Sequence, residues 1–167
     1  ALAILQMHMA RTCGIDADGV NFPGHFLVRC SAEGETALID PFNAGAPVDA
    51  AELRRLLKAV EGEDAELQPH HYATADDRAI LLRLQNNIKL RLIKAQDYTA
   101  ALPVAERMLW LSPGNANLWH EIGVLNAQLG HYGAAIEALQ TVASLDASGA
   151  LQQEVAALMQ QLRRRLN

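Results

Sequence analysis

Hydrophobic and polar positions follow two different patterns along the chain, and the change falls near residue 60. Before it, short apolar runs are separated by glycine, proline and asparagine, which is typical of short strands and helices joined by turns. After residue 74, apolar positions recur every three or four residues over long stretches, which predicts successive helices. The sequence therefore predicts an α+β part followed by an all-α part.

The first part predicts a helix, a β-hairpin and a second helix. Leu2, Leu5 and Met9 recur at helical spacing. Later, Asp49 is placed to cap a helix with a buried leucine stripe. In chain order the expected elements are a helix at 2–13, a loop at 19–24, strands at 26–30 and 36–40, and a helix at 50–60 with Leu53, Leu56 and Leu57 on its stripe. The expected domains are 1–60 and 74–167, joined by a polar linker at 61–73.

Two copies of one pattern lie 34 residues apart within residues 83–147. Thirty-four residues is the period of the tetratricopeptide repeat, in which each copy is a pair of antiparallel helices. The matching pairs are Tyr98 and Tyr132, Ala101 and Ala135, Leu111 and Leu145, and Ile88 and Ile122. Small residues at Gly123, Ala101 and Ala135 are expected where the paired helices approach closely, with large side chains such as Trp119 and Leu139 filling the space between layers.

The first copy of the repeat departs from the second. Gln85 and Lys89 stand where the second copy has a tryptophan and a glycine, whereas the closing proline, Pro113, is matched in the second copy by Ala147. Two copies are fewer than the three that stacking usually needs, so the repeats are expected to lean on the N-terminal part or on a second chain.

One predicted helix opens the repeats and another follows them. Thr74 and Asp77 resemble a capping box, which predicts a helix running to about residue 95. The last helix, 151–166, carries an apolar stripe and a polar face, and it either caps the repeat stack or binds a partner. Its stripe consists of Leu151, Val155, Leu158, Leu162 and Leu166.

Composition excludes several classes of function. The net charge of −5 gives no electrostatic basis for nucleic-acid binding, and the arginines at 163–165 suit the C-terminus of a helix. No apolar run approaches the ~20 residues that span a bilayer. The only cysteines, Cys13 and Cys30, lack metal-site spacing and fit a reducing cytoplasm. The adjacent His70 and His71 are expected to point apart, so we predict no metal and no cofactor.

His25 begins the first predicted strand, and Asp40 ends the second. Across a hairpin the two residues face each other, so the carboxylate can hold the imidazole in one tautomer. That is the base-and-orienter half of a Cys-His-Asp arrangement. A structural hydrogen bond between the strands explains the pair equally simply, and both interpretations stay open.

The run GVNFPGHFLVR at 19–29, the run LIDPFN at 38–43 and the repeats together resemble the bacterial SirB-type family. Members join a transglutaminase-like domain to C-terminal tetratricopeptide repeats. The resemblance implies that His25 and Asp40 match the histidine and aspartate of a Cys-His-Asp triad. It also implies that the nucleophilic cysteine begins the helix at 2–13, just before residue 1. Members of the family often lack that cysteine.

Neither cysteine of the chain matches the nucleophile, and both are expected to be core residues. The chain starts without Met inside an apolar segment, which suggests a fragment whose open N-terminal face can self-associate. The leading hypothesis is a non-catalytic, cytoplasmic scaffold that binds a protein or peptide partner. The alternative is a cysteine-dependent acyl transferase or amidase, with His25 as base and Asp40 orienting it.

The partner would bind along the concave groove formed by the first helix of each repeat. Residues expected to face that groove are Arg83, Asn86, Leu90, Lys94, Asn117, His120, Val124 and Gln128. Leu90 and Val124 stand at two positions where repeats that clamp a terminal carboxylate use polar residues, so we expect a different kind of ligand. A solvated helix face remains the simpler alternative.

Overall fold

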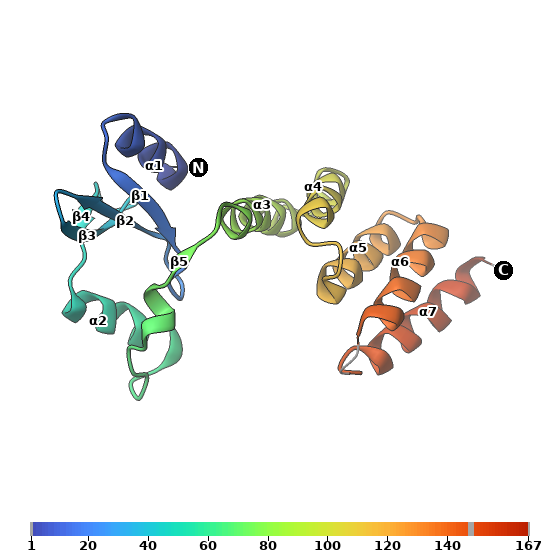
Figure 1. Ribbon diagram of the computed structural model, residues 1–167. Coiled ribbons are helices and arrows are strands. Elements are labelled where there is room, and N and C mark those ends of the chain that lie inside the picture. The colour runs from blue at the N-terminus through green and yellow to red at the C-terminus, as the bar shows by residue number, and fades with distance from the viewer. Residues whose placement is uncertain (1, 147–148, 167) are drawn as a thin grey trace. The chain divides into compact units, whose positions relative to one another are not determined.

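The computed structural model describes residues 2–146 and 149–166 (Figure 1). These residues form two compact units, 1–81 and 82–167, and the division falls inside α3. The elements are α1 (Leu2–Thr12), β1 (Asp16–Val20), β2 (Leu27–Ala32), β3 (Glu35–Asp40), β4 (Ala46–Pro47), α2 (Ala50–Glu61), a 3-10 helix (Pro69–Tyr72), β5 (Thr74–Ala75), α3 (Asp77–Lys94), α4 (Tyr98–Leu111), α5 (Ala116–Gln128), α6 (Tyr132–Leu145) and α7 (Gln152–Leu166). The predicted order, α+β and then all-α, is confirmed.

The first unit is an antiparallel sheet with one helix on each face (Figure 1). The strand order is β4-β3-β2-β1-β5. Side chains alternate between the faces of a strand, so Val28 packs with Met7 of α1 while Leu27 packs with Leu57 of α2. The helix predicted at 50–60 is confirmed, and the Asp49 carboxylate caps it by accepting from the Glu52 N–H at 2.8 Å.

A two-residue turn closes the predicted hairpin of β2 and β3. Glu33 and Gly34 both have positive φ, 53° and 86°, which is the conformation that the tightest hairpin turns require. Ala32 pairs with Glu35 beside the turn, and the ladder runs on to Val28 and Ile39.

The loop predicted at 19–24 begins two residues too early, because β1 continues to Val20. β1 lies between β2 and β5 and was not predicted as a strand. Its Gly19 is dictated by packing: a Cβ there would lie 2.6 Å from the Phe26 ring and 2.8 Å from Ile80.

The capping box predicted at Thr74 and Asp77 is wrong. Thr74 belongs to β5, where it pairs with Val20 of β1. The cap is Asp76, whose carboxylate accepts a hydrogen bond from the Ala79 N–H at 2.6 Å, so α3 starts at Asp77.

The polar segment 61–73, expected to be a linker, contributes to the first unit. Ala65, Leu67 and Tyr72 pack against the core between α2 and the sheet. The segment is therefore positioned by apolar contacts, and its 3-10 helix leads directly into β5.

The second unit consists of helix pairs with the small residues at their contacts. Ala101 and Ala135 are fully buried. A Cβ on Gly123 of α5 would lie 2.8 Å from Leu139 Cγ of α6, which explains why this position has no side chain. The Trp119 indole N–H donates to the Pro113 carbonyl at 2.8 Å, tying α5 to the preceding turn.

α7 packs on α6 through the apolar stripe predicted from the sequence. Val155 and Leu162 are buried against Leu139 and Val142, and Leu151 and Leu158 pack partly buried beside them. The Leu166 side chain and Ala147 lie outside the described residues. At the end of α7, the Arg165 guanidinium lies 5.9 Å from the centre of the Tyr132 ring.

Candidate functional site

His25 and Asp40 lie at the same end of the sheet. His25 lies two residues before β2 and Asp40 ends β3, and these strands are antiparallel. Continuing the observed register places Asp40 opposite Leu27 and His25 opposite Phe42, so the two residues are diagonal rather than directly opposed.

The two residues have separate hydrogen-bond partners. The Asp40 carboxylate accepts from the Phe42 N–H at 2.8 Å, which holds the turn after β3. The His25 N–H donates to the Phe22 carbonyl at 3.0 Å. Within the described part of the chain no hydrogen bond or ion pair joins the imidazole to the carboxylate. The structure thus brings the residues to one end of the sheet without linking them directly.

A cavity of about 420 Å³ lies beside Asp40, between the β3–β4 turn and the start of α2. Glu52 and Arg55 line it and form a two-pronged ion pair, with Arg55 nitrogens 2.6 and 2.8 Å from the Glu52 carboxylate. That hydrogen bonding lowers the pKa of Glu52, and the charge of His25 adds a smaller effect in the same direction. His25 therefore affects the electrostatics at the first turn of α2.

Neither cysteine lies in this region. Cys13 follows α1 and is exposed, so its expected burial in the core is wrong. Cys30 lies in the middle of β2, half-buried against α1, and burial raises the pKa of its thiol. A thiol in that environment is a poor nucleophile because little of it is ionised near neutral pH.

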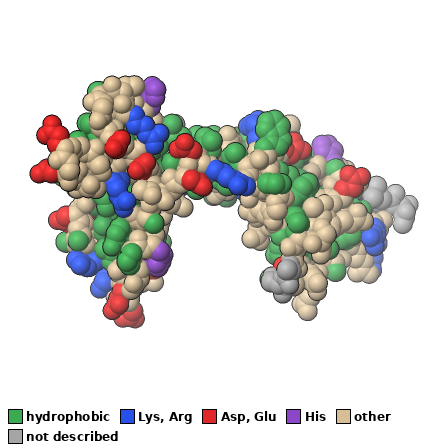
Figure 2. Space-filling model, viewed as in Figure 1, with side chains coloured by type: hydrophobic (Ala, Val, Ile, Leu, Met, Phe, Trp, Pro, Cys, Tyr) green, Lys and Arg blue, Asp and Glu red, His purple; other side chains and the backbone are tan. Residues whose placement is uncertain are grey.

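α1 buries a different face from the one that its leucines suggest. Ala3 and Met7 are buried against the sheet, whereas Leu2, Leu5 and Met9 are 48%, 55% and 59% exposed. A cavity of about 330 Å³ separates them from the turn at Pro41. Figure 2 shows hydrophobic side chains at the surface of each unit.

The eight residues predicted to line the repeat groove lie on α3 and α5, in four pairs spaced 34 residues apart. Their exposure varies. Leu90 is 51% exposed, and Lys94, Asn117 and Gln128 are also exposed. The half-buried members are Arg83, Asn86, His120 and Val124.

Two members of this set have local interactions. His120 Nε2 lies 3.5 Å from a Glu154 carboxylate oxygen, so the imidazole is placed between α5 and α7. Burial lowers the pKa of the Arg83 guanidinium. The His120–Glu154 contact and the burial of Arg83 make the predicted face partly structural.

The adjacent histidines at 70 and 71 do not point apart as expected. Their ring centres lie 4.0 Å apart because a short 3-10 helix replaces the regular element assumed. His71 Nδ1 accepts from the Gln68 N–H at 2.9 Å.

Among the described residues, no group of three or more His, Cys, Asp or Glu side chains is placed to hold a metal ion. None of the described helices combines the length and apolar character needed to span a membrane.

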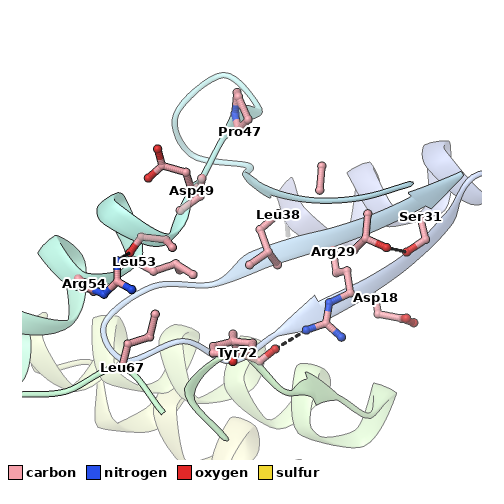
Figure 3. A pocket seen from close by; sticks show the side chains of 14 residues that line it. Asp18, Arg29, Ser31, Leu38, Pro47, Asp49, Leu53, Arg54, Leu67 and Tyr72 are labelled. Carbon is pink, nitrogen blue, oxygen red and sulfur yellow. Dashed lines mark hydrogen bonds between the residues drawn. The ribbon is translucent and has the colours of Figure 1, made fainter. Parts of the chain in front are cut away.

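A second group of polar residues was not singled out from the sequence. Arg29 of β2 and Arg54 of α2 line a groove on the α2 side of the sheet (Figure 3). Arg29 follows Val28 and precedes Cys30 in the predicted strand. A charged residue among these apolar ones was the signal from which the sequence could have indicated this group.

These features define a two-part protein, with a transglutaminase-like unit followed by helical repeats. The family model of the transglutaminase-like superfamily matches residues 1–86, and that of the tetratricopeptide repeat matches residues 88–167. The chain therefore belongs to the transglutaminase-like superfamily, and its resemblance to the SirB-type family is confirmed.

Several bacterial proteins resemble this chain over most of its length. A UPF0162 protein of Xylella fastidiosa strain Temecula1 is 35% identical over 143 residues, covering 84% of this chain and 51% of the relative. A UPF0162 protein of Pseudomonas aeruginosa is 35% identical over 116 residues, covering 70% and 42%. Protein SirB1 of Salmonella typhimurium is 29% identical over 130 residues, covering 77% and 48%. The chain spans about half the length of the curated relatives it matches.

Proposed function

We propose that the repeat unit binds a protein or peptide partner along the face of α3 and α5. The single observation that carries this proposal is the repeated set of side chains on that face. Leu90 and Val124 are equivalent positions of the two copies, and each has polar neighbours one turn away on the same helix. Two apolar positions in register, flanked by hydrogen-bonding groups, suit a peptide that presents apolar anchors between polar residues.

The proposal is tested by affinity capture with the 167-residue chain as bait. Asn86→Ala and His120→Ala remove groove side chains, and Gln140→Ala on α6 is the matched polar control, since Gln140 is exposed and lies outside the set. We expect both groove variants to lose partners that the wild type and the control retain. If every bound partner is unchanged in both groove variants, the proposal fails. Because His120 contacts Glu154, the melting temperature of each variant is measured alongside.

We infer that the transglutaminase-like unit is non-catalytic and has a structural role. A second candidate, cysteine-dependent acyl transfer or amide hydrolysis, is favoured by one observation: His25 and Asp40 share one end of the sheet. In that reaction His25 accepts the proton of a thiol and Asp40 orients the ring. Amide hydrolysis and acyl transfer by the wild type that His25→Ala abolishes would establish the enzyme and overturn the non-catalytic role.

We also propose that the outer face of α1 takes part in self-association. Leu2, Leu5 and Met9 expose apolar area beside the turn at Pro41. Sedimentation velocity tests the proposal with Leu5→Glu as the disrupting variant. A concentration-dependent dimer that this variant abolishes supports it, and a wild-type monomer at high concentration ends it. A cytoplasmic location, which suits two free cysteines, is tested by cell fractionation.

A further inference from the structure

A groove of about 970 Å³ lies between the sheet and α2 in the first unit (Figure 3). Its polar side is formed by residues of β2 and β3, among them Arg29, Ser31 and Thr36. Its apolar side is formed by Leu38, Leu53 and Leu67. α2 covers only the part of this face around Leu38, so the polar positions further along the strands stay open.

Two guanidinium groups in the groove have no carboxylate partner. Arg29 donates to the Tyr72 carbonyl at 2.5 Å, and Figure 3 shows its side chain turned toward that atom. Arg54 donates to the Ala50 carbonyl at 3.3 Å. Across the described residues, no carboxylate oxygen lies within 4.0 Å of either guanidinium.

The acidic residues of the groove are occupied elsewhere. The Asp18 carboxylate lies 3.5 Å from Arg11 of α1. The Asp49 carboxylate accepts the Glu52 N–H at the start of α2. The groove therefore offers two positive charges that no nearby carboxylate neutralises. Arg29 and Arg54 each donate a hydrogen bond to a backbone carbonyl. Such a pair favours an anionic group, and a guanidinium binds a carboxylate through paired hydrogen bonds.

The edge of β3 beside this groove is open. β4 pairs only with Ile39 and Asp40, and the Val48 N–H then donates to the Leu38 carbonyl at 2.7 Å. In an antiparallel strand alternate residues direct both backbone groups to the same side, so Thr36 presents its N–H and C=O on the same edge as Leu38. No strand of the described chain pairs with that part of the edge.

We propose that this groove binds an extended acidic peptide of a partner protein, which adds a strand along the open edge of β3. Backbone hydrogen bonds to Thr36 fix the peptide's register, and alternate side chains then point into the groove. Acidic side chains meet Arg29 and Arg54, and apolar ones rest on Leu38 and Leu53. The Glu35 carboxylate does not repel the acidic peptide, because strand alternation directs its side chain to the other face of the sheet.

Fluorescence anisotropy with the 167-residue chain tests the charge recognition. The probe is a fluorescein-labelled peptide of alternating leucine and glutamate, and the comparison peptide has glutamine in place of glutamate. Arg54→Gln and Arg29→Gln are each expected to weaken binding of the glutamate peptide about tenfold, the effect of losing one charge-assisted contact. Arg55→Gln is the matched control, because Arg55 pairs with Glu52 and does not line the groove. It is expected to bind as the wild type does.

Amide hydrogen exchange at Thr36 tests the strand addition in the same samples. We expect slower exchange at Thr36 when the glutamate peptide is present. Equal binding by Arg54→Gln, Arg29→Gln and Arg55→Gln, or no binding to the wild type, would overturn the proposal. Slow amide exchange at Thr36 in the absence of peptide, in a dimer that forms as the concentration rises, would also overturn the proposal. A second copy of the chain would then occupy the open edge of β3. Leu90→Glu on the repeat face separates this proposal from the proposed function: probe binding that Leu90→Glu abolishes and both arginine variants retain would overturn the groove as the site.

Discussion

Lys89 of α3 donates a hydrogen bond to the Glu121 carboxylate of α5, and this ion pair joins the two repeats. Lys89 is 1% exposed and occupies the position that Gly123 has in the second repeat. In the second repeat, α5 and α6 pack closely because Gly123 has no side chain. The first instead buries a long cation and compensates its charge with a carboxylate on α5, the first helix of the second repeat.

Removing the carboxylate should therefore cost more stability than removing the buried cation. Glu121→Ala leaves Lys89 buried without its partner, and we expect the free energy of unfolding to fall by about 2 kcal/mol. Lys89→Met, which replaces the cation by an apolar side chain of similar length, should cost less. Both tryptophans lie in the repeat unit, so urea unfolding followed by tryptophan fluorescence reports on that unit. A loss for Glu121→Ala no larger than for the exposed Glu106→Ala would contradict the account.

Gly123 should be intolerant of any side chain. Gly123→Ala brings a Cβ to 2.8 Å from Leu139 Cγ, and we expect a loss of stability of about 1–3 kcal/mol from overpacking. Gly133→Ala in α6 is the matched control, because a Cβ there has no heavy atom within 4 Å and alanine suits a helix better than glycine. It should leave the melting temperature unchanged or raise it. Equal effects of the two substitutions would show that close packing does not explain Gly123.

The repeats could be predicted because their pattern is local and repeated. The sheet was harder to predict. β1 reads Asp-Ala-Asp-Gly-Val, and aspartate and glycine are depleted in strands, so its central position in the sheet overrode its local preference. Its small residues are explained only by what packs on them, such as Phe26 against Gly19. β4 and β5 have two residues each, too few to show any periodicity.

The candidate site was predicted in part. The hairpin placed His25 and Asp40 at one end of the sheet, as their spacing suggested, but the register makes them diagonal. The electrostatic effect of His25 on Glu52 depends on how α2 folds back onto the sheet, and no local pattern encodes it. The same holds for Arg29, whose hydrogen-bond partner Tyr72 is 43 residues away in the chain.

The two cysteines should differ in reactivity. Cys13 is exposed, whereas burial raises the pKa of the Cys30 thiol and reduces its ionised fraction. We expect iodoacetamide at about pH 8 to modify Cys13 first. Peptide mapping by mass spectrometry gives the modification rates of the two cysteines. In Cys13→Ser, Cys30 is the only cysteine, so its rate is measured alone. Faster modification of Cys30 would mean that its side of β2 opens in solution.

The titration of Glu52 tests the surroundings of His25. The hydrogen bond from Arg55 lowers the pKa of Glu52, with His25 adding a smaller effect. A lowered pKa means that the stabilising contribution is present above the ordinary glutamate pKa and is lost as the pH falls through the folded-state value. In carboxyl-carbon NMR titrations, Arg55→Gln should raise the Glu52 pKa more than His25→Ala does. An unchanged pKa in His25→Ala would place the imidazole further from α2.

Site-specific photo-crosslinking tests the central claim, that the face of α3 and α5 binds a partner, most directly. A photoreactive amino acid replaces Leu90 on that face or, as the control, Trp110 of α4, which is 84% exposed. Each variant is irradiated in cells, and the crosslinked proteins are identified by mass spectrometry. The account predicts a defined crosslinked partner at position 90 that is absent at position 110. Crosslinks at position 110 with none at position 90 would contradict it.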